Sequence, residues 1–110
     1  MQSFSQQIID IVWRKAEKID GYDENIWRQD FAGAWINKNA YGTTSPYGWE
    51  IDHRFPLSKG GSDTLENMYP CQWRNNRMKG DDYPNFRTIV TSSGNTNIER
   101  EQSWVVRSNR

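Results

Sequence analysis

The chain contains a single histidine, His53, in a segment that also carries carboxylate, amide and amine groups. A neutral imidazole can take a proton from water near pH 7, because its unperturbed pKa is about 6.5. Asp52 precedes this histidine, and Asn76 and Lys79 follow it further along the chain. Hydrolysis of a phosphodiester needs an activated water, positive charge at the leaving oxygen and cations that hold the phosphate. These residues are therefore candidates for metal-assisted cleavage of a phosphodiester.

Asp52 and Asn76 offer the oxygen atoms that a hard divalent cation prefers in proteins. Asp52 lies beside His53 on a predicted strand, so its side chain should point to the opposite face of that strand. A twist or bulge at the strand end would bring both side chains to one phosphate. Asn76 lies in a predicted helix, where Lys79 shares its face. We therefore predict one divalent metal ion between Asp52 and Asn76, with Mg²⁺ expected and Mn²⁺ as the alternative.

Two strands, the loop between them and a helix must position these residues. The sequence predicts strand, loop, strand and helix at residues 49–55, 58–64, 65–70 and 72–79. Gly60-Gly61 in the loop tolerates positive φ angles and turns the chain. Pro70 is expected to end the second strand because it has no N–H donor. Gly80 is a natural stop for the helix.

The N-terminal region predicts an amphipathic helix over residues 3–20. Ser3 with Gln6 fits a capping box, and apolar residues recur at helical spacing as far as Ile19. Gly21 is a plausible end of this helix. The bland interpretation, a helix that covers the core, is favoured over a membrane-surface helix or one that binds a partner.

The rest of the chain predicts one extended piece and a C-terminal hairpin. The aromatic, irregular middle segment favours short helical turns, with an extended piece near residues 34–36. Strands are expected over residues 86–93 and 97–106, around Gly94-Asn95-Thr96. The chain length and this order of elements predict one α+β domain spanning residues 1–110.

The composition favours a folded domain with an aromatic core. There are only two leucines but six Trp, five Tyr and four Phe, so these rings are expected to supply the core rather than to stack on bases. The 14 basic and 14 acidic residues cancel, which excludes an all-over cationic nucleic-acid binder. Four arginines make the C-terminal end basic, where a solvated face is favoured over a phosphate clamp: Arg87, Arg100, Arg107 and Arg110.

Cys71 is the only cysteine, so an intrachain disulfide and a Cys-x-x-Cys zinc site are both excluded. No structural zinc is expected, and Cys71 should act as a small apolar filler. No apolar run approaches the roughly 20 residues of a membrane span, and the start lacks the pattern of a signal peptide. We therefore expect a soluble cytoplasmic protein with no membrane contact, with export without a cleaved signal as the alternative.

In combination, Asp52-His53, Asn67 and Asn76-x-x-Lys79 resemble the motif of the HNH endonuclease family, in its small bacterial or phage form with asparagine at the last position. The resemblance covers about residues 50–82. It implies a ββα-metal fold with its core at about residues 49–82, and cleavage of DNA with one divalent cation. The chain departs from relatives that carry paired cysteines for structural zinc or several histidines at the metal.

The same resemblance implies a role for each matching residue. His53 would be the general base that activates water, and Asp52 and Asn76 would hold the cation at the scissile phosphate. Asn67 would join the catalytic set by hydrogen bonding across the loop and fixing the backbone around His53. Phosphate oxygens would be met by Lys79, Arg77 and, as a weaker candidate, Lys59.

Two other functions fit parts of the pattern. A catalytically silent module on an HNH scaffold could bind nucleic acid or a partner protein, but such a module has no need to keep His53, Asp52 and Asn76. A zinc protein using His53 and Cys71 would have too few soft ligands. Because the charge is balanced, a nuclease of this size is expected to gain affinity through a homodimer or a protein partner.

Overall fold

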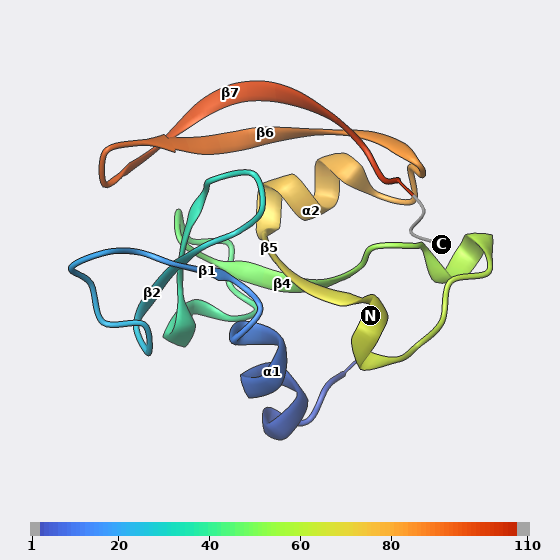
Figure 1. Ribbon diagram of the computed structural model, residues 1–110, viewed down its shortest axis with the longest axis horizontal. Coiled ribbons are helices and arrows are strands. Elements are labelled where there is room, and N and C mark those ends of the chain that lie inside the picture. The colour runs from blue at the N-terminus through green and yellow to red at the C-terminus, as the bar shows by residue number, and fades with distance from the viewer. Residues whose placement is uncertain (1–2, 108–110) are drawn as a thin grey trace.

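The computed structural model describes residues 3–107, which form two α-helices and three antiparallel sheets. Figure 1 shows these elements in layers, with the β6–β7 hairpin above α2, the β4–β5 pair below α2, and α1 below that pair. The predicted α+β class is confirmed. The helices are α1 Gln6–Trp13 and α2 Trp73–Lys79. The strands are β1 Glu17–Lys18, β2 Trp27–Gln29, β3 Trp35–Asn37, β4 Trp49–His53, β5 Met68–Gln72, β6 Asn85–Ser93 and β7 Thr96–Val105.

The centre of the fold is the antiparallel pair of β4 and β5, with α2 packed against both strands. The second strand lies later than predicted, because Leu65–Asn67 forms a 3-10 turn instead of its first residues. Pro70 does not end the strand; it lies inside β5 opposite Ile51. A two-stranded sheet leaves one edge of each strand unpaired, so a residue without an N–H donor can be accommodated there.

Helix α2 follows β5 directly and matches its prediction closely. The Gln72 side chain caps the helix by accepting hydrogen bonds from the backbone N–H groups of Arg74 and Asn75. Gly80 ends the helix with a φ of 52°, a value that favours glycine. Capping at both ends therefore defines where this short helix begins and ends.

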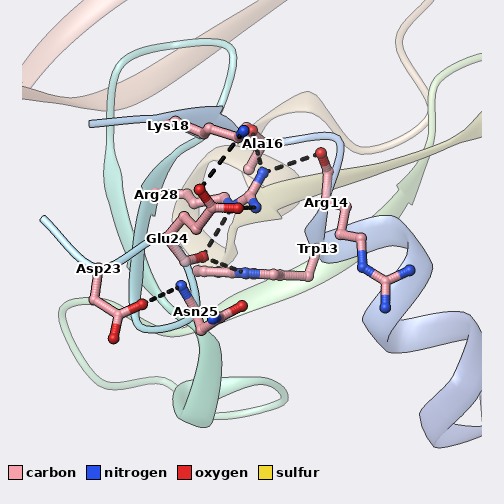
Figure 2. Close-up of polar contacts among 8 residues, drawn as sticks. All are labelled: Trp13, Arg14, Ala16, Lys18, Asp23, Glu24, Asn25 and Arg28. Atoms are coloured by element: carbon pink, nitrogen blue, oxygen red, sulfur yellow. Dashed lines mark hydrogen bonds and ion pairs between the residues drawn. The ribbon is translucent and has the colours of Figure 1, made fainter. Parts of the chain in front are cut away.

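Helix α1 is shorter than predicted and begins later, because Ser5 rather than Ser3 caps it. Its end is set from elsewhere in the chain. The buried Arg28 guanidinium donates hydrogen bonds to the carbonyl oxygens of Arg14 and Ala16, as Figure 2 shows. Those carbonyls then have a partner outside the helix, and the chain continues into β1, which pairs with β2.

The core contains both aromatic and aliphatic side chains. Trp13 packs against Trp49 with their ring centroids 5.4 Å apart, and both are buried. The expectation that the aromatic residues supply the core is right for these two and for Trp35, but Tyr22 is exposed. The buried residues of the main cluster are Ile9, Val12, Trp13, Ala16, Ile36, Trp49, Ile51 and Met68.

The predicted hairpin is confirmed, with β6 and β7 joined at Gly94-Asn95. It packs on α2 through buried Phe86 and Val90. Arg87 pairs with Glu101 across the exposed face, in keeping with a solvated hairpin. Arg110 lies outside the described residues. Within residues 3–107 no helix is long and apolar enough to cross a membrane.

Candidate active site

One cavity of about 280 Å³ lies where the end of β4 meets α2, and it is lined by Asp52, His53 and Asn76. The structure therefore brings the predicted base and both predicted metal ligands to the same place. Asp81, which the sequence did not single out, also lines this cavity, together with residues of the loop after β4. A second cavity of about 510 Å³ adjoins it and shares His53 and Asn76.

His53 is held by a carboxylate. Its Nε2 atom lies 2.9 Å from Asp63 Oδ1, and its side chain is only 13% exposed. An ionised carboxylate only accepts hydrogen bonds, so this contact favours the tautomer with the proton on Nε2 and a free lone pair on Nδ1. Sequence reasoning missed Asp63, whose only signal was an acid just after the Gly-Gly turn that faces the histidine.

Asn67 fastens the loop between β4 and β5. Its Nδ2 atom donates hydrogen bonds to the backbone oxygens of Phe55 and Ser62, and its Oδ1 atom accepts one from Phe55 N–H, all at 2.8 Å. This geometry agrees with the loop-fixing role that the motif implied. Gly61 is also required by space, because a Cβ atom there would lie 1.8 Å from the Phe55 oxygen.

Asp52 is buried and only partly satisfied. Lys79 Nζ lies 3.2 Å from its Oδ1 atom, whereas Oδ2 has no hydrogen-bond partner among the described residues. Arg54 Nε lies 3.9 Å from Oδ2, close enough for an ion pair but too far for a hydrogen bond. Burial raises the pKa of Asp52, and the nearby charges of Lys79 and Arg54 oppose that rise.

The prediction that Lys79 meets phosphate oxygens is not supported by its position. Its side chain is 0% exposed and lies between α2 and β4, where it also approaches the His53 carbonyl oxygen at 3.5 Å. Lys79 lies one turn after Asn76 on α2, but its side chain is buried whereas Asn76 lines the cavity. Lys79 instead neutralises Asp52.

Arg77 and Lys59 remain accessible. The Arg77 side chain is 52% exposed, lines the larger cavity and pairs with Glu50 Oε2 at 3.0 Å. Lys59 lies exposed on the loop, at the end of the 3-10 turn Leu57–Lys59. Of the three predicted phosphate contacts, these two are open to a bound strand.

The residues fit a lightly ligated oxygen-bound cation. Asp52 Oδ2 is a buried oxygen without a hydrogen bond, and Asn76 places an amide in the same cavity. Between residues 3 and 107 no group of three His, Cys, Asp or Glu side chains could hold a metal. Such a small set of ligands suits Mg²⁺, which keeps several of its waters.

Cys71 is fully buried in β5, and burial raises the pKa of its thiol, so a zinc site built on it is not supported.

One segment of the chain is similar to a known protein family. Residues 33–85 match the HNH endonuclease family. The match runs from just before β3 to the first residue of β6, and it confirms the resemblance of the motif. HNH endonucleases act on DNA and generally use a divalent metal ion, so the family favours a nuclease-type function for this HNH segment. No curated protein and no solved structure shows a significant match to the chain.

Proposed function

We propose that this protein is a metal-dependent HNH endonuclease that hydrolyses phosphodiester bonds of DNA. The observation that carries the proposal is the arrangement around His53. The imidazole contacts Asp63 through Nε2, and His53 lines the same cavity as Asp52 and Asn76. A water placed in that cavity would have a base beside it and two ligand oxygens nearby.

His53 acts as the general base in this proposal. Its Nδ1 lone pair takes a proton from the attacking water, and the resulting imidazolium is stabilised by Asp63, which accepts from Nε2–H. General-base catalysis of this kind contributes roughly 10²- to 10⁴-fold to a rate. Asn67 acts indirectly, by holding the backbone that follows His53.

Asp52 and Asn76 would hold one divalent ion, Mg²⁺ or Mn²⁺. When bound, that ion supplies positive charge at the scissile phosphate and at the leaving oxygen. The charge of Lys79 favours the ionised form of the buried Asp52 carboxylate and opposes the rise in its pKa that burial causes. Arg77 and Lys59 are the side chains that would meet the phosphates of the bound strand.

A plasmid assay tests this proposal. Purified protein should convert supercoiled plasmid into nicked or linear DNA in the presence of Mg²⁺ or Mn²⁺. His53→Ala should lower the rate by at least about 100-fold while leaving the thermal unfolding profile in place. If the His53→Ala protein cleaves at an unchanged rate, the assignment of His53 as the base is wrong.

A catalytically silent HNH module is the second candidate, and one observation favours it. Lys79 already forms an ion pair with Asp52, so the Asp52 carboxylate attracts a metal cation less strongly than an unpaired carboxylate would. This candidate predicts intact plasmid with every divalent metal, together with measurable binding of DNA or of a protein. Metal-dependent cleavage that disappears in His53→Ala excludes it.

A further inference from the structure

Glu50 lies beside the candidate metal ligand without being part of the motif. Its carboxylate contacts two neighbouring residues of α2: Oε1 accepts a hydrogen bond from Asn76 Nδ2 at 2.9 Å, and Oε2 accepts one from Arg77 at 3.0 Å. The Glu50 side chain is only 19% exposed. It comes from β4, two residues before Asp52, so both acids project from the same face of that strand.

The chemistry of this contact sets the orientation of an amide. Asn76 can present either its NH₂ group or its carbonyl oxygen to a neighbour, but only the oxygen can ligate a cation. An ionised carboxylate has no hydrogen to donate, so Glu50 accepts only the NH₂ group. The described hydrogen bonds of the Asn76 side chain use Nδ2 alone, which leaves Oδ1 unengaged beside the cavity that contains Asp52.

We infer that Glu50 is a positioning residue for the metal site: it holds the Asn76 amide with its oxygen available to a divalent cation. This inference rests on the proposed function, and it assigns a role to a residue outside the motif. The same carboxylate also pairs with the Arg77 guanidinium, which lines the larger cavity. Glu50 therefore contacts both the proposed metal ligand Asn76 and the proposed phosphate contact Arg77.

Two explanations for an effect of Glu50 must be separated, orientation and simple charge. Any carboxylate near a divalent cation attracts it, whether or not it touches Asn76. Glu50→Asp separates the two, because it keeps the negative charge but shortens the side chain by one methylene and withdraws it from Nδ2. An orienting role predicts weaker metal binding for this variant, whereas a pure charge effect predicts unchanged binding.

The experiment is a double-mutant cycle on Mn²⁺ binding, followed by paramagnetic resonance of the free ion with no DNA present. The proteins are the unaltered chain, Glu50→Asp, Asn76→Ala and the double variant. We expect the Kd for Mn²⁺ to rise about 10-fold in Glu50→Asp, as is usual for partners that orient a ligand. Added to Asn76→Ala, the same change should have no further effect.

A matched control uses Glu101, an exposed glutamate that pairs with Arg87 at the same 3.0 Å but lies on the hairpin. Glu101→Asp should leave the Kd for Mn²⁺ unchanged. Thermal unfolding verifies that each variant is folded. If Glu50→Asp is not, Glu50→Gln replaces it, and because that change also removes the charge, only its non-additivity with Asn76→Ala then supports an orienting role. An unchanged Kd in Glu50→Asp, additive losses in the cycle, or no Mn²⁺ binding by the unaltered protein would each overturn the inference.

The outcome can be separated from that of the nuclease proposal. If Mn²⁺ binding shows the coupling but plasmid stays intact, the role of Glu50 stands and the nuclease proposal fails. If plasmid is cleaved in a His53-dependent way but the losses are additive, the nuclease proposal stands and Glu50 has no orienting role.

Discussion

At the scale of single residues, carboxylates decide which atoms of their neighbours are left free for chemistry. Asp63 meets Nε2 of His53, and Glu50 meets Nδ2 of Asn76. In each case the carboxylate engages a nitrogen and leaves the other heteroatom of the same side chain unengaged by it. Neither acid belongs to the recognised motif, yet each would control a residue that does.

Replacing Asp63 with Asn should therefore lower activity without unfolding the protein. The amide can offer His53 either a donor or an acceptor, so the preference for the Nε2–H tautomer is weakened. We expect plasmid cleavage to slow, by up to about 10⁴-fold if the wrong tautomer dominates. Because the chain has one histidine, the ¹⁵N shifts of its ring report the tautomer directly.

Asp20→Asn is a suitable control for that measurement, since Asp20 is exposed in the turn after β1. It should change neither the cleavage rate nor the ring shifts of His53. Cleavage at the full rate by Asp63→Asn, with unchanged ring shifts, would show that the contact has no orienting role.

Asp30 supplies a pH-dependent contribution to stability. Its carboxylate is fully buried, and burial raises its pKa above 3.8, against the opposing hydrogen bonds from Gln72, Asn75, Ala34 and Ala32. A raised pKa means that the folded state binds the proton more tightly than the unfolded state does. The associated stability is therefore complete below pH 3.8 and is lost as the pH rises through the raised value.

Urea unfolding of the unaltered protein and of Asp30→Asn, repeated over a pH series, checks this sign. The free energy of unfolding of the unaltered protein, taken relative to the variant, should decrease as the pH rises above 3.8. A difference that is constant or increases with pH would contradict the raised pKa of Asp30.

At the scale of elements, α2 is held between the sheet that carries the site and the hairpin. Asn75, on its buried side, accepts hydrogen bonds from the N–H groups of Ile89 and Val90, and it donates to the Val90 oxygen and to Asp30. This one side chain therefore links α2 to β6 and to the turn between β2 and β3. Its neighbour in sequence, Asn76, faces the candidate site.

Asn75→Ala should destabilise the fold by about 3 kcal/mol, because it leaves several buried backbone groups without partners. The effect is measured by urea unfolding. Asn85→Ala, at an exposed position of β6, should change the free energy of unfolding by less than about 0.5 kcal/mol. Equal small effects of the two changes would show that water replaces the Asn75 contacts without cost.

Local patterns were sufficient to predict the first strand, the loop and the helix of the site, but they placed the second strand too early. The Gly60-Gly61 turn and the Gly80 stop act within a few residues, so the loop and the helix end follow directly from the sequence. The end of α1 could not be predicted, because Arg28 donates to the carbonyl oxygens of Arg14 and Ala16, just after the helix, from fourteen and twelve residues away. The burial of Lys79 and the roles of Asp63 and Glu50 likewise depend on which side chains meet across the fold.

At the scale of the whole molecule, many of the basic side chains that balance the acidic ones also form ion pairs with them. Five of the described ion pairs engage an arginine: those of Arg28, Arg54, Arg74, Arg77 and Arg87. A phosphate that approaches most of these arginines must compete with an acid already in place. Among residues 3–107, these five arginines therefore offer DNA only cations that are already paired, and affinity supplied by a homodimer or a protein partner stays a prediction.

DNA binding should accordingly depend only moderately on salt. If about two or three phosphates are neutralised, the logarithm of the binding constant should fall with the logarithm of salt concentration with a slope of about −2 to −3. Fluorescence anisotropy of a labelled duplex with the His53→Ala protein, from about 50 to about 200 mM KCl, measures this slope. A slope steeper than about −6 would indicate an extended cationic surface that the ion pairs do not predict.

The buried thiol of Cys71 has a practical consequence for following this protein in solution. Because the sulfur is fully buried and the pKa of the thiol is raised, maleimide reagents should not react with Cys71 while the chain is folded. A cysteine introduced on the open loop, for example at Lys59, would then be the sole point of attachment for a dye. The native chain is thus already a clean background for single-molecule fluorescence of the loop against labelled DNA.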